Sequence, residues 1–136
     1  MNVIHFPVWR VRFYVDELDR NFIRQWLYEQ EISDPDRNAL QTLIDICESS
    51  GLYAISYSTE PLEEGFFAIC SRRKGGADIR LVCCEGPTGE TEITALAGAV
   101  IDEDGELRPS YVVGIARDNL RELKKNPSRW RRERVT

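Results

Sequence analysis

Arginine and lysine side chains gather towards the end of the chain, where they offer the charge that binds phosphates or acidic partners. From Arg117 onward there are eight basic and three acidic residues, a net charge of +5. The preceding residues include ten basic and twenty acidic ones, and the whole chain has a formal net charge of −5. The pattern predicts either a basic surface for such a ligand or a solvated helix end whose cations favour the helix dipole.

One aromatic side chain, Trp130, lies inside this basic segment, between Arg129 and Arg131. An indole can stack on a nucleic-acid base or on a guanidinium, so these three residues are candidates for RNA binding. The sequence leaves a second interpretation open, in which the indole anchors residues 127–136 onto the core.

Thiols and imidazoles give little support for metal or nucleophilic chemistry. Cysteine stands at positions 47, 70, 83 and 84, without a CxxC pair, and His5 is the one histidine. A zinc site needs converging ligands, so we expect buried, reduced thiols. No glycine-rich phosphate loop and no Cys/His pair can be assembled, which predicts no metal and no small-molecule cofactor. The acidic run 102–104 could hold a divalent cation, although Asp104-Gly105 is also a hairpin-turn signal.

Length and composition fit one globular domain. The chain has 136 residues, of which 42% are hydrophobic and 30% charged, values that are ordinary for a soluble protein. No apolar run approaches the roughly 20 residues that span a bilayer, and the first residues lack the pattern of a signal peptide. We expect a cytoplasmic protein that does not contact a membrane.

The elements that position these groups begin with a strand over residues 8–15, which is rich in β-formers. Residues 20–32 carry apolar side chains at helical spacing. Ser33 is a candidate N-cap for a second helix, which Gly51 ends. Because only a short link separates the two helices, they predict an antiparallel helical hairpin.

After Gly51 the pattern changes to short extended segments separated by turns. We expect extended segments at residues 53–57, 66–70, 78–85 and 92–101, followed by a helix at residues 111–125. Strands that tight turns connect are antiparallel, and one face of their sheet needs a cover. The prediction is an α+β fold, with a small antiparallel sheet packed against an N-terminal helical hairpin and a C-terminal helix. Residues 1–126 form this single domain and residues 127–136 a basic C-terminal tail.

Three stretches of the chain resemble the RelE-like toxin superfamily, in particular its HigB-type, phage-derived branch. PLEEGFFAIC at residues 61–70 is similar to the family's "PL…GLWELR" strand. GGADIRLV at residues 75–82 is similar to "GGxYRVLY", and residues 92–100 to the strand that ends in "LLHGFxKK". The resemblance covers about residues 10–125 and implies a RelE-like fold.

The resemblance implies a ribosome-dependent messenger RNA endonuclease, the toxin of a type II toxin–antitoxin system, which a cognate antitoxin protein holds inactive. In such a reaction a 2′-OH attacks the adjacent phosphate, with a base, an acid and cations to assist. Arg80 stands where the family has its strand arginine, and Tyr111 is the candidate for proton transfer. On the adjoining turn, Arg72, Arg73 and Lys74 extend the cationic surface that would bind RNA. The implied partners are the antitoxin, the ribosome and its message.

The chain also departs from the family, and the departures support an alternative. Residues 68–70 are Ala-Ile-Cys where the family has "ELR", and residues 97–99 are Ala-Gly-Ala where it has "HGF". Arg80 can then serve to pair with a glutamate across the sheet, and Tyr111 can serve in packing. The alternative function is a non-catalytic protein-binding module on the same fold, with a phage-derived relative as its suggested origin.

Overall fold

A computed structural model describes residues 8–87 and 89–136, so that His5 lies outside the described residues. Three α-helices alternate with strands and short 3-10 helices in the described part of the chain. In chain order the elements are β1 (Arg10–Tyr14), α1 (Phe22–Glu29), α2 (Asp34–Ser50), η1 (Leu52–Ser58), β2 (Thr59–Pro61), η2 (Glu63–Gly65), β3 (Phe67–Arg72), β4 (Asp78–Glu85), β5 (Glu92–Ile101), β6 (Leu107–Arg108), α3 (Val112–Lys125), η3 (Pro127–Arg129) and β7 (Trp130–Arg131).

The sheet corrects the predicted fold. It is mixed and has seven strands, in the order β2-β3-β4-β5-β1-β7, with β6 paired to β5. Strands β3, β4 and β5 are antiparallel neighbours as expected, and the unpredicted β2 pairs antiparallel with β3, but β1 runs parallel to β5. The prediction of a small, purely antiparallel sheet behind an N-terminal helical hairpin is therefore wrong. The first described element is a strand, and the two helices follow it.

The parallel pairing of β1 with β5 explains why the sequence predicts too few strands in the sheet. Antiparallel neighbours are joined by short turns that the sequence displays, whereas a parallel pair needs a long crossover. Between β1 and β5 the chain forms two α-helices and three strands, so no local pattern reveals this pairing. Strand β1 inserts because Val11 and Phe13 bury their side chains on the face that α1 and α2 cover.

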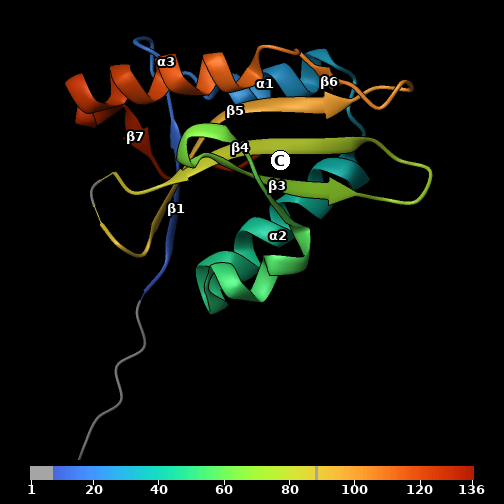
Figure 1. Cartoon of the computed structure of the whole chain (residues 1–136), viewed down its shortest axis with the longest axis horizontal. Coiled ribbons are helices and arrows are strands. Elements are labelled where there is room, and N and C mark those ends of the chain that lie inside the picture. The colour runs from blue at the N-terminus through green and yellow to red at the C-terminus, as the bar shows by residue number, and fades with distance from the viewer. Residues whose placement is uncertain (1–7, 88) are drawn as a thin grey trace, which may run out of the picture.

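Helices cover both faces of the sheet, with α3 and α2 on opposite sides of the strands (Figure 1). On one face, Ile23 of α1 and Ile44 of α2 belong to the same apolar cluster as Leu81 of β4. On the other face, Val112 and Ala116 of α3 belong to a second apolar cluster with strands β4 and β5. Among the described residues, no helix has the length and apolar character that crossing a membrane requires.

Helix α2 begins and ends where the sequence indicates. The Ser33 hydroxyl accepts a hydrogen bond from the Asp36 N–H at 3.3 Å, which is the expected N-cap geometry. Gly51 takes a positive φ of 90° after the last turn. The following residues 53–57 correct a prediction, because they form the 3-10 helix η1 rather than an extended segment. In η1 only Ile55 is buried. The alternating apolar residues of this segment therefore correspond to one buried isoleucine between two exposed tyrosines, not to a strand.

Residues 127–136, the predicted tail, lie against the domain. Strand β7 pairs antiparallel with the end of β1, and Val135 is fully buried in the cluster that α1 and α2 form. The Val135 N–H donates to Gln41 Oε1 at 2.9 Å. The Arg134 carbonyl accepts a hydrogen bond from the Asn21 side chain at 2.8 Å.

A buried carboxylate connects helix α2 to the turn between β3 and β4, and its removal gives a first prediction. Asp36 accepts hydrogen bonds from Arg73 Nη1 at 2.8 Å and from the Ala77 N–H at 3.0 Å. We expect Asp36→Asn to lower the free energy of unfolding by about 2 kcal/mol, because a charged acceptor is lost. Urea unfolding measures the change, and the exposed Asp118→Asn is the control, expected within about 0.5 kcal/mol of wild type.

The pH dependence of the same variant checks the mechanism. Burial alone would raise the pKa of Asp36, but hydrogen bonds from Ala77, Arg73 and Ser33 lower it below its ordinary value of 3.8. The stability that this carboxylate contributes is therefore complete above the unfolded pKa and is lost as the pH falls through the native pKa. The difference between wild type and Asp36→Asn should shrink in that acidic range. A difference that stays constant there would contradict this role.

Candidate functional site

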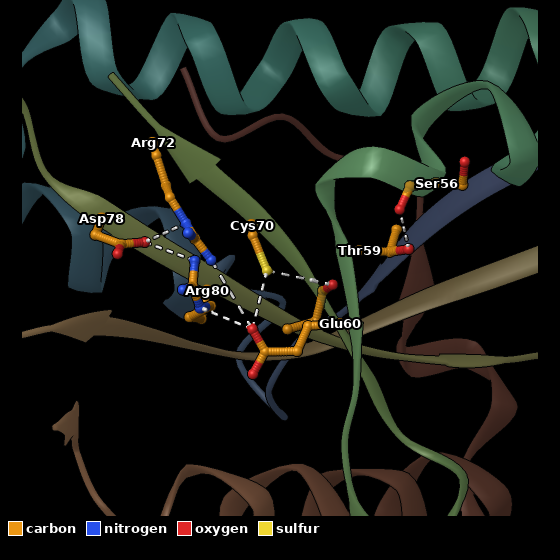
Figure 2. A network of polar contacts seen from close by, with 8 residues as sticks. Ser56, Thr59, Glu60, Cys70, Arg72, Asp78 and Arg80 are labelled. Carbon is orange, nitrogen blue, oxygen red and sulfur yellow. Dashed lines mark hydrogen bonds and ion pairs between the residues drawn. The ribbon is translucent and has the colours of Figure 1, made fainter. Parts of the chain in front are cut away.

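Charged side chains gather on the face of the sheet turned away from α2, at its β2–β3 side. Strand register places Cys70 opposite Arg80 and Arg72 opposite Asp78, so these four side chains point to the same face. On the neighbouring strand, Glu60 stands opposite Ala68 and shares that face. Figure 2 shows the resulting group, with Arg72, Arg80 and Asp78 on one side and Glu60 reaching towards them from β2.

Arg80 lies at the centre of this group and is almost completely buried. Its side chain is 8% exposed and donates from Nη1 to Asp78 Oδ1 at 2.5 Å. Its Nε lies 3.9 Å from Glu60 Oε2. The buried guanidinium therefore positions the carboxylates of Asp78 and Glu60. Because so little of its surface is exposed, Arg80 offers little access to a ligand.

Arg72 and Glu60 form the accessible part of the group. The side chain of Arg72 is 62% exposed and that of Glu60 is 50% exposed. Arg72 Nη2 lies 4.0 Å from Glu60 Oε2, and Arg72 Nε lies 3.6 Å from Asp78 Oδ1. These distances are long for hydrogen bonds, so the two ion pairs hold Arg72 only weakly. The side chain of Arg72 also contacts the Cys70 thiol.

A small cleft of about 190 Å³ opens beside these side chains. It is lined by Tyr57, Ser58, Thr59, Glu60, Cys70 and Arg72. Tyr57 is strongly exposed. The Thr59 hydroxyl donates to the Ser56 carbonyl at 2.9 Å, which fixes the backbone where β2 begins (Figure 2). The cleft thus combines a carboxylate, an exposed guanidinium and an aromatic ring.

Cys70 lines this cleft as a buried thiol. Burial raises the pKa of the Cys70 thiol above its ordinary value of 9.0, against the opposing effect of Arg80. Burial likewise raises the pKa of Cys47 and of Cys84 to about 11, and Cys83 is completely enclosed. All four cysteines are free thiols, and a protonated thiol is a poor nucleophile.

Only one of the three turn cations predicted to bind RNA joins this group. Arg73 points to the opposite face, where it pairs with Asp36 of α2. Lys74 is exposed at the tip of the turn, next to Gly75. The turn therefore contributes Arg72 to the site, uses Arg73 to fasten the hairpin to α2, and leaves Lys74 in solvent.

Tyr111, the predicted proton-transfer residue, lines another cleft. It precedes α3 and is strongly exposed. Its cleft of about 560 Å³ includes Asp102, Asp104, Glu106 and Arg108, but not Arg80. Three carboxylates in that lining would repel a phosphate.

The acidic loop itself has a structural explanation. Asp102 Oδ1 accepts hydrogen bonds from the N–H groups of Asp104 and Glu106, and its Oδ2 pairs with Arg108 at 2.5 Å. The hydrogen bond from Arg108 is the main cause that lowers the pKa of Asp102. Over residues 8–87 and 89–136, no group of three His, Cys, Asp or Glu side chains is arranged to hold a metal ion.

The predicted RNA-binding residues of the C-terminal segment lie at the far edge of the sheet. Trp130 and Arg131 belong to β7, which is four strands away from β3, or about 19 Å at the usual strand spacing. The indole stacks under Arg12 at 4.4 Å. Arg131 pairs with Asp19 at 2.8 Å, and Arg129 Nε lies 3.7 Å from Glu122. The structure therefore does not bring these residues to the cleft beside Arg72.

Comparisons with protein-family models, with curated proteins and with solved structures found no match to this chain. A half-exposed carboxylate next to two guanidiniums can accept a proton from a hydroxyl while the cations stabilise an adjacent anion. Sequence reasoning missed Glu60, because it stands in a glutamate-rich loop region and only the pairing of β2 with β3 directs it to Arg80.

Proposed function

We propose that the protein is an RNA endonuclease that cuts messenger RNA on the ribosome, the toxin of a type II toxin–antitoxin pair acting in the cytoplasm. The observation that carries the proposal is the position of Glu60, whose carboxylate lies within about 4 Å of both Arg80 and Arg72 at an open cleft. This arrangement supplies the base that the sequence alone does not reveal. The resemblance to RelE-like toxins supplies the substrate class and the cognate antitoxin as partner.

In the proposed reaction Glu60 accepts the proton of a ribose 2′-OH, and the freed oxygen attacks the neighbouring phosphorus. Arg72 turns to the phosphate and stabilises the added negative charge. The bond from phosphorus to the 5′-oxygen breaks, and that oxygen takes a proton from the hydroxyl of Tyr57. The products are a 2′,3′-cyclic phosphate and a 5′-hydroxyl end. Arg80 touches no substrate and keeps Glu60 in position.

The charge of the cleft supports the proposed dependence on the ribosome. Two arginines and two carboxylates, Glu60 and Asp78, balance each other in this group. Free RNA binds mainly through an excess of cations over its phosphates, and this cleft has no such excess. We therefore infer that the message is delivered to the cleft by the ribosome rather than captured from solution.

A cleavage assay with translating ribosomes tests the function. We expect the purified protein to cut ribosome-bound message and to leave a 2′,3′-cyclic phosphate, while the same message free in solution is cut far more slowly. A message with a 2′-deoxy nucleotide at the mapped cut should resist cleavage at that position, since the attacking hydroxyl is missing. Intact message on ribosomes, or cleavage that survives the 2′-deoxy substitution, would contradict the proposed reaction.

A second candidate, the non-catalytic protein-binding module, is favoured by one observation. Arg80 already has carboxylate partners on both sides, Asp78 at 2.5 Å and Glu60 at 3.9 Å. The charge of such a cation is compensated within the sheet and needs no ligand. The assay above separates the two functions, because a binding module leaves the message intact and instead forms a stable complex with a partner protein.

A further inference from the structure

Strand β1 leaves half of one edge uncovered. On one side it pairs with β5 over residues 10–13. On its other side β7 covers only Phe13 and Tyr14. After Arg131 the chain leaves the sheet and turns to α1 and α2, where Val135 is buried. The edge next to Trp9 and Val11 therefore receives no strand from the described part of the chain.

The main chain of Val11 points to this uncovered edge. The Arg10 N–H donates to the Thr91 carbonyl at 3.0 Å, so the amide of Arg10 faces the β5 side. On the other side, the Val15 N–H donates to the Arg129 carbonyl at 2.8 Å. Because amides alternate along a strand, Val11 directs its N–H and carbonyl to the same side as Val15. Among residues 8–87 and 89–136, no strand accepts or donates there.

A cleft of about 750 Å³ runs along this edge. It is lined by Val8, Trp9, Arg10, Val11, Arg12, Asp45, Glu48, Ser49 and Arg132. The floor is formed by β1 and one wall by the last turns of α2. An extended backbone that enters the cleft can continue the sheet where β7 ends, in the manner of strand addition.

Among the described residues, the carboxylates along the cleft have ion-pair partners, whereas the arginines of β1 do not. On the α2 wall, Glu48 lies 3.6 Å from Arg132, and Asp45 lies 3.9 Å from Arg134, so these carboxylates have partners. Arg10 is exposed, and Arg12 stacks on Trp130. Within the described ranges neither of these two arginines has a carboxylate within ion-pair distance. Arg10 therefore remains available to an added strand, and Arg12 carries a positive charge without a carboxylate partner in this part of the chain while it stacks on Trp130.

We propose that this edge binds an extended, acidic segment of a partner protein, which adds to the sheet beside β1. Side chains directly opposite each other on neighbouring strands interact, so alternate acidic residues of the segment would meet Arg10 and Arg12. The same rule disfavours a second copy of this chain. Antiparallel pairing of two β1 edges about Val11 places Arg10 of one copy opposite Arg12 of the other, and like charges repel there.

A synthetic peptide tests the proposal, and the test does not depend on RNA cleavage. The probe is a blocked peptide of alternating glutamate and valine, about six residues long, the usual length of a strand. We expect it to shift the amide resonances of residues 9–12 and to slow hydrogen exchange of the Val11 amide. The control peptide has lysine in place of each glutamate and should bind at least about fivefold more weakly, since it meets the same arginines with like charge.

Substitution of the exposed Arg10 checks the contact. Arg10→Glu should weaken binding of the glutamate peptide by at least about fivefold and improve binding of the lysine peptide. The matched control, Arg121→Glu on α3, reverses the same charge away from the cleft and should change neither affinity. Equal binding of both peptides would overturn the proposal, and so would a Val11 amide that is not protected from hydrogen exchange. Protection that rises with protein concentration, as dimers form, would overturn it as well.

Discussion

Replacing Glu60 by glutamine is expected to slow cleavage of ribosome-bound message by about 10² to 10⁴, the usual contribution of a general base. Glutamine has nearly the same shape as glutamate but cannot accept the proton of a 2′-OH. Arg80 keeps its shorter contact to Asp78 at 2.5 Å, so the sheet beneath the cleft should stay folded. The measurement is the single-turnover rate of message cleavage with ribosomes in excess, together with the thermal midpoint of each protein.

A neighbouring glutamate provides the matched control. Glu63 is exposed and lies three residues along the chain in η2, outside the lining of the cleft. Glu63→Gln removes the same charge from the same region of the surface and should leave the cleavage rate within about twofold of wild type. An equal loss of activity in both variants would point to net charge rather than proton transfer. An unchanged rate in Glu60→Gln would remove Glu60 from the mechanism.

The local elements of this fold are readable from the sequence because their determinants are local. Strand β4 and strand β5 have the predicted ranges, set by β-forming residues between glycine-containing turns. Helix α2 follows from the Ser33 cap and the positive φ of Gly51. The placement of β1 beside β5 is not local, since it depends on burying Val11 and Phe13 under helices that come later in the chain. The size and mixed character of the sheet were missed for this reason.

The residues of the candidate site also fall into two groups, those that the sequence indicates and those that only strand pairing brings together. The sequence points to Arg80 through its match to the family's strand arginine and to Arg72 through the cationic turn beside it. Their partner Glu60 comes from β2, a strand of three residues that includes a proline, and so short a strand gives no periodic signal. The sequence points to Tyr111 through its position near the end of the sheet and to Trp130 through its arginine neighbours, but the topology carries both away from the cleft. Residue type predicts what a side chain can do, but strand pairing decides which side chains meet.

The buried end of the chain allows an equally decisive test of stability, through Val135→Asp. Val135 is completely enclosed, and an aspartate there would place a carboxylate without a partner among apolar side chains. The C-terminal segment can avoid burying the carboxylate by leaving the core. The free energy of undocking therefore sets an upper limit on the loss of stability. Undocking forfeits the burial of one valine, roughly 1.5–3 kcal/mol, and hydrogen bonds to Gln41 and from Asn21 at about 1 kcal/mol each. We therefore expect the free energy of unfolding to fall by about 3–5 kcal/mol.

Urea unfolding of Val135→Asp beside Leu18→Asp separates docking of the segment from a general effect of added charge. Leu18 is strongly exposed, so its replacement by aspartate should change stability by no more than about 0.5 kcal/mol. Acidification should restore part of the stability of Val135→Asp, because burial favours the neutral carboxyl and protonation removes the charge. If residues 132–136 behaved as a free basic tail, both variants would match wild type. The expected contrast arises because Val135 belongs to the same apolar cluster that β1 and the two helices build.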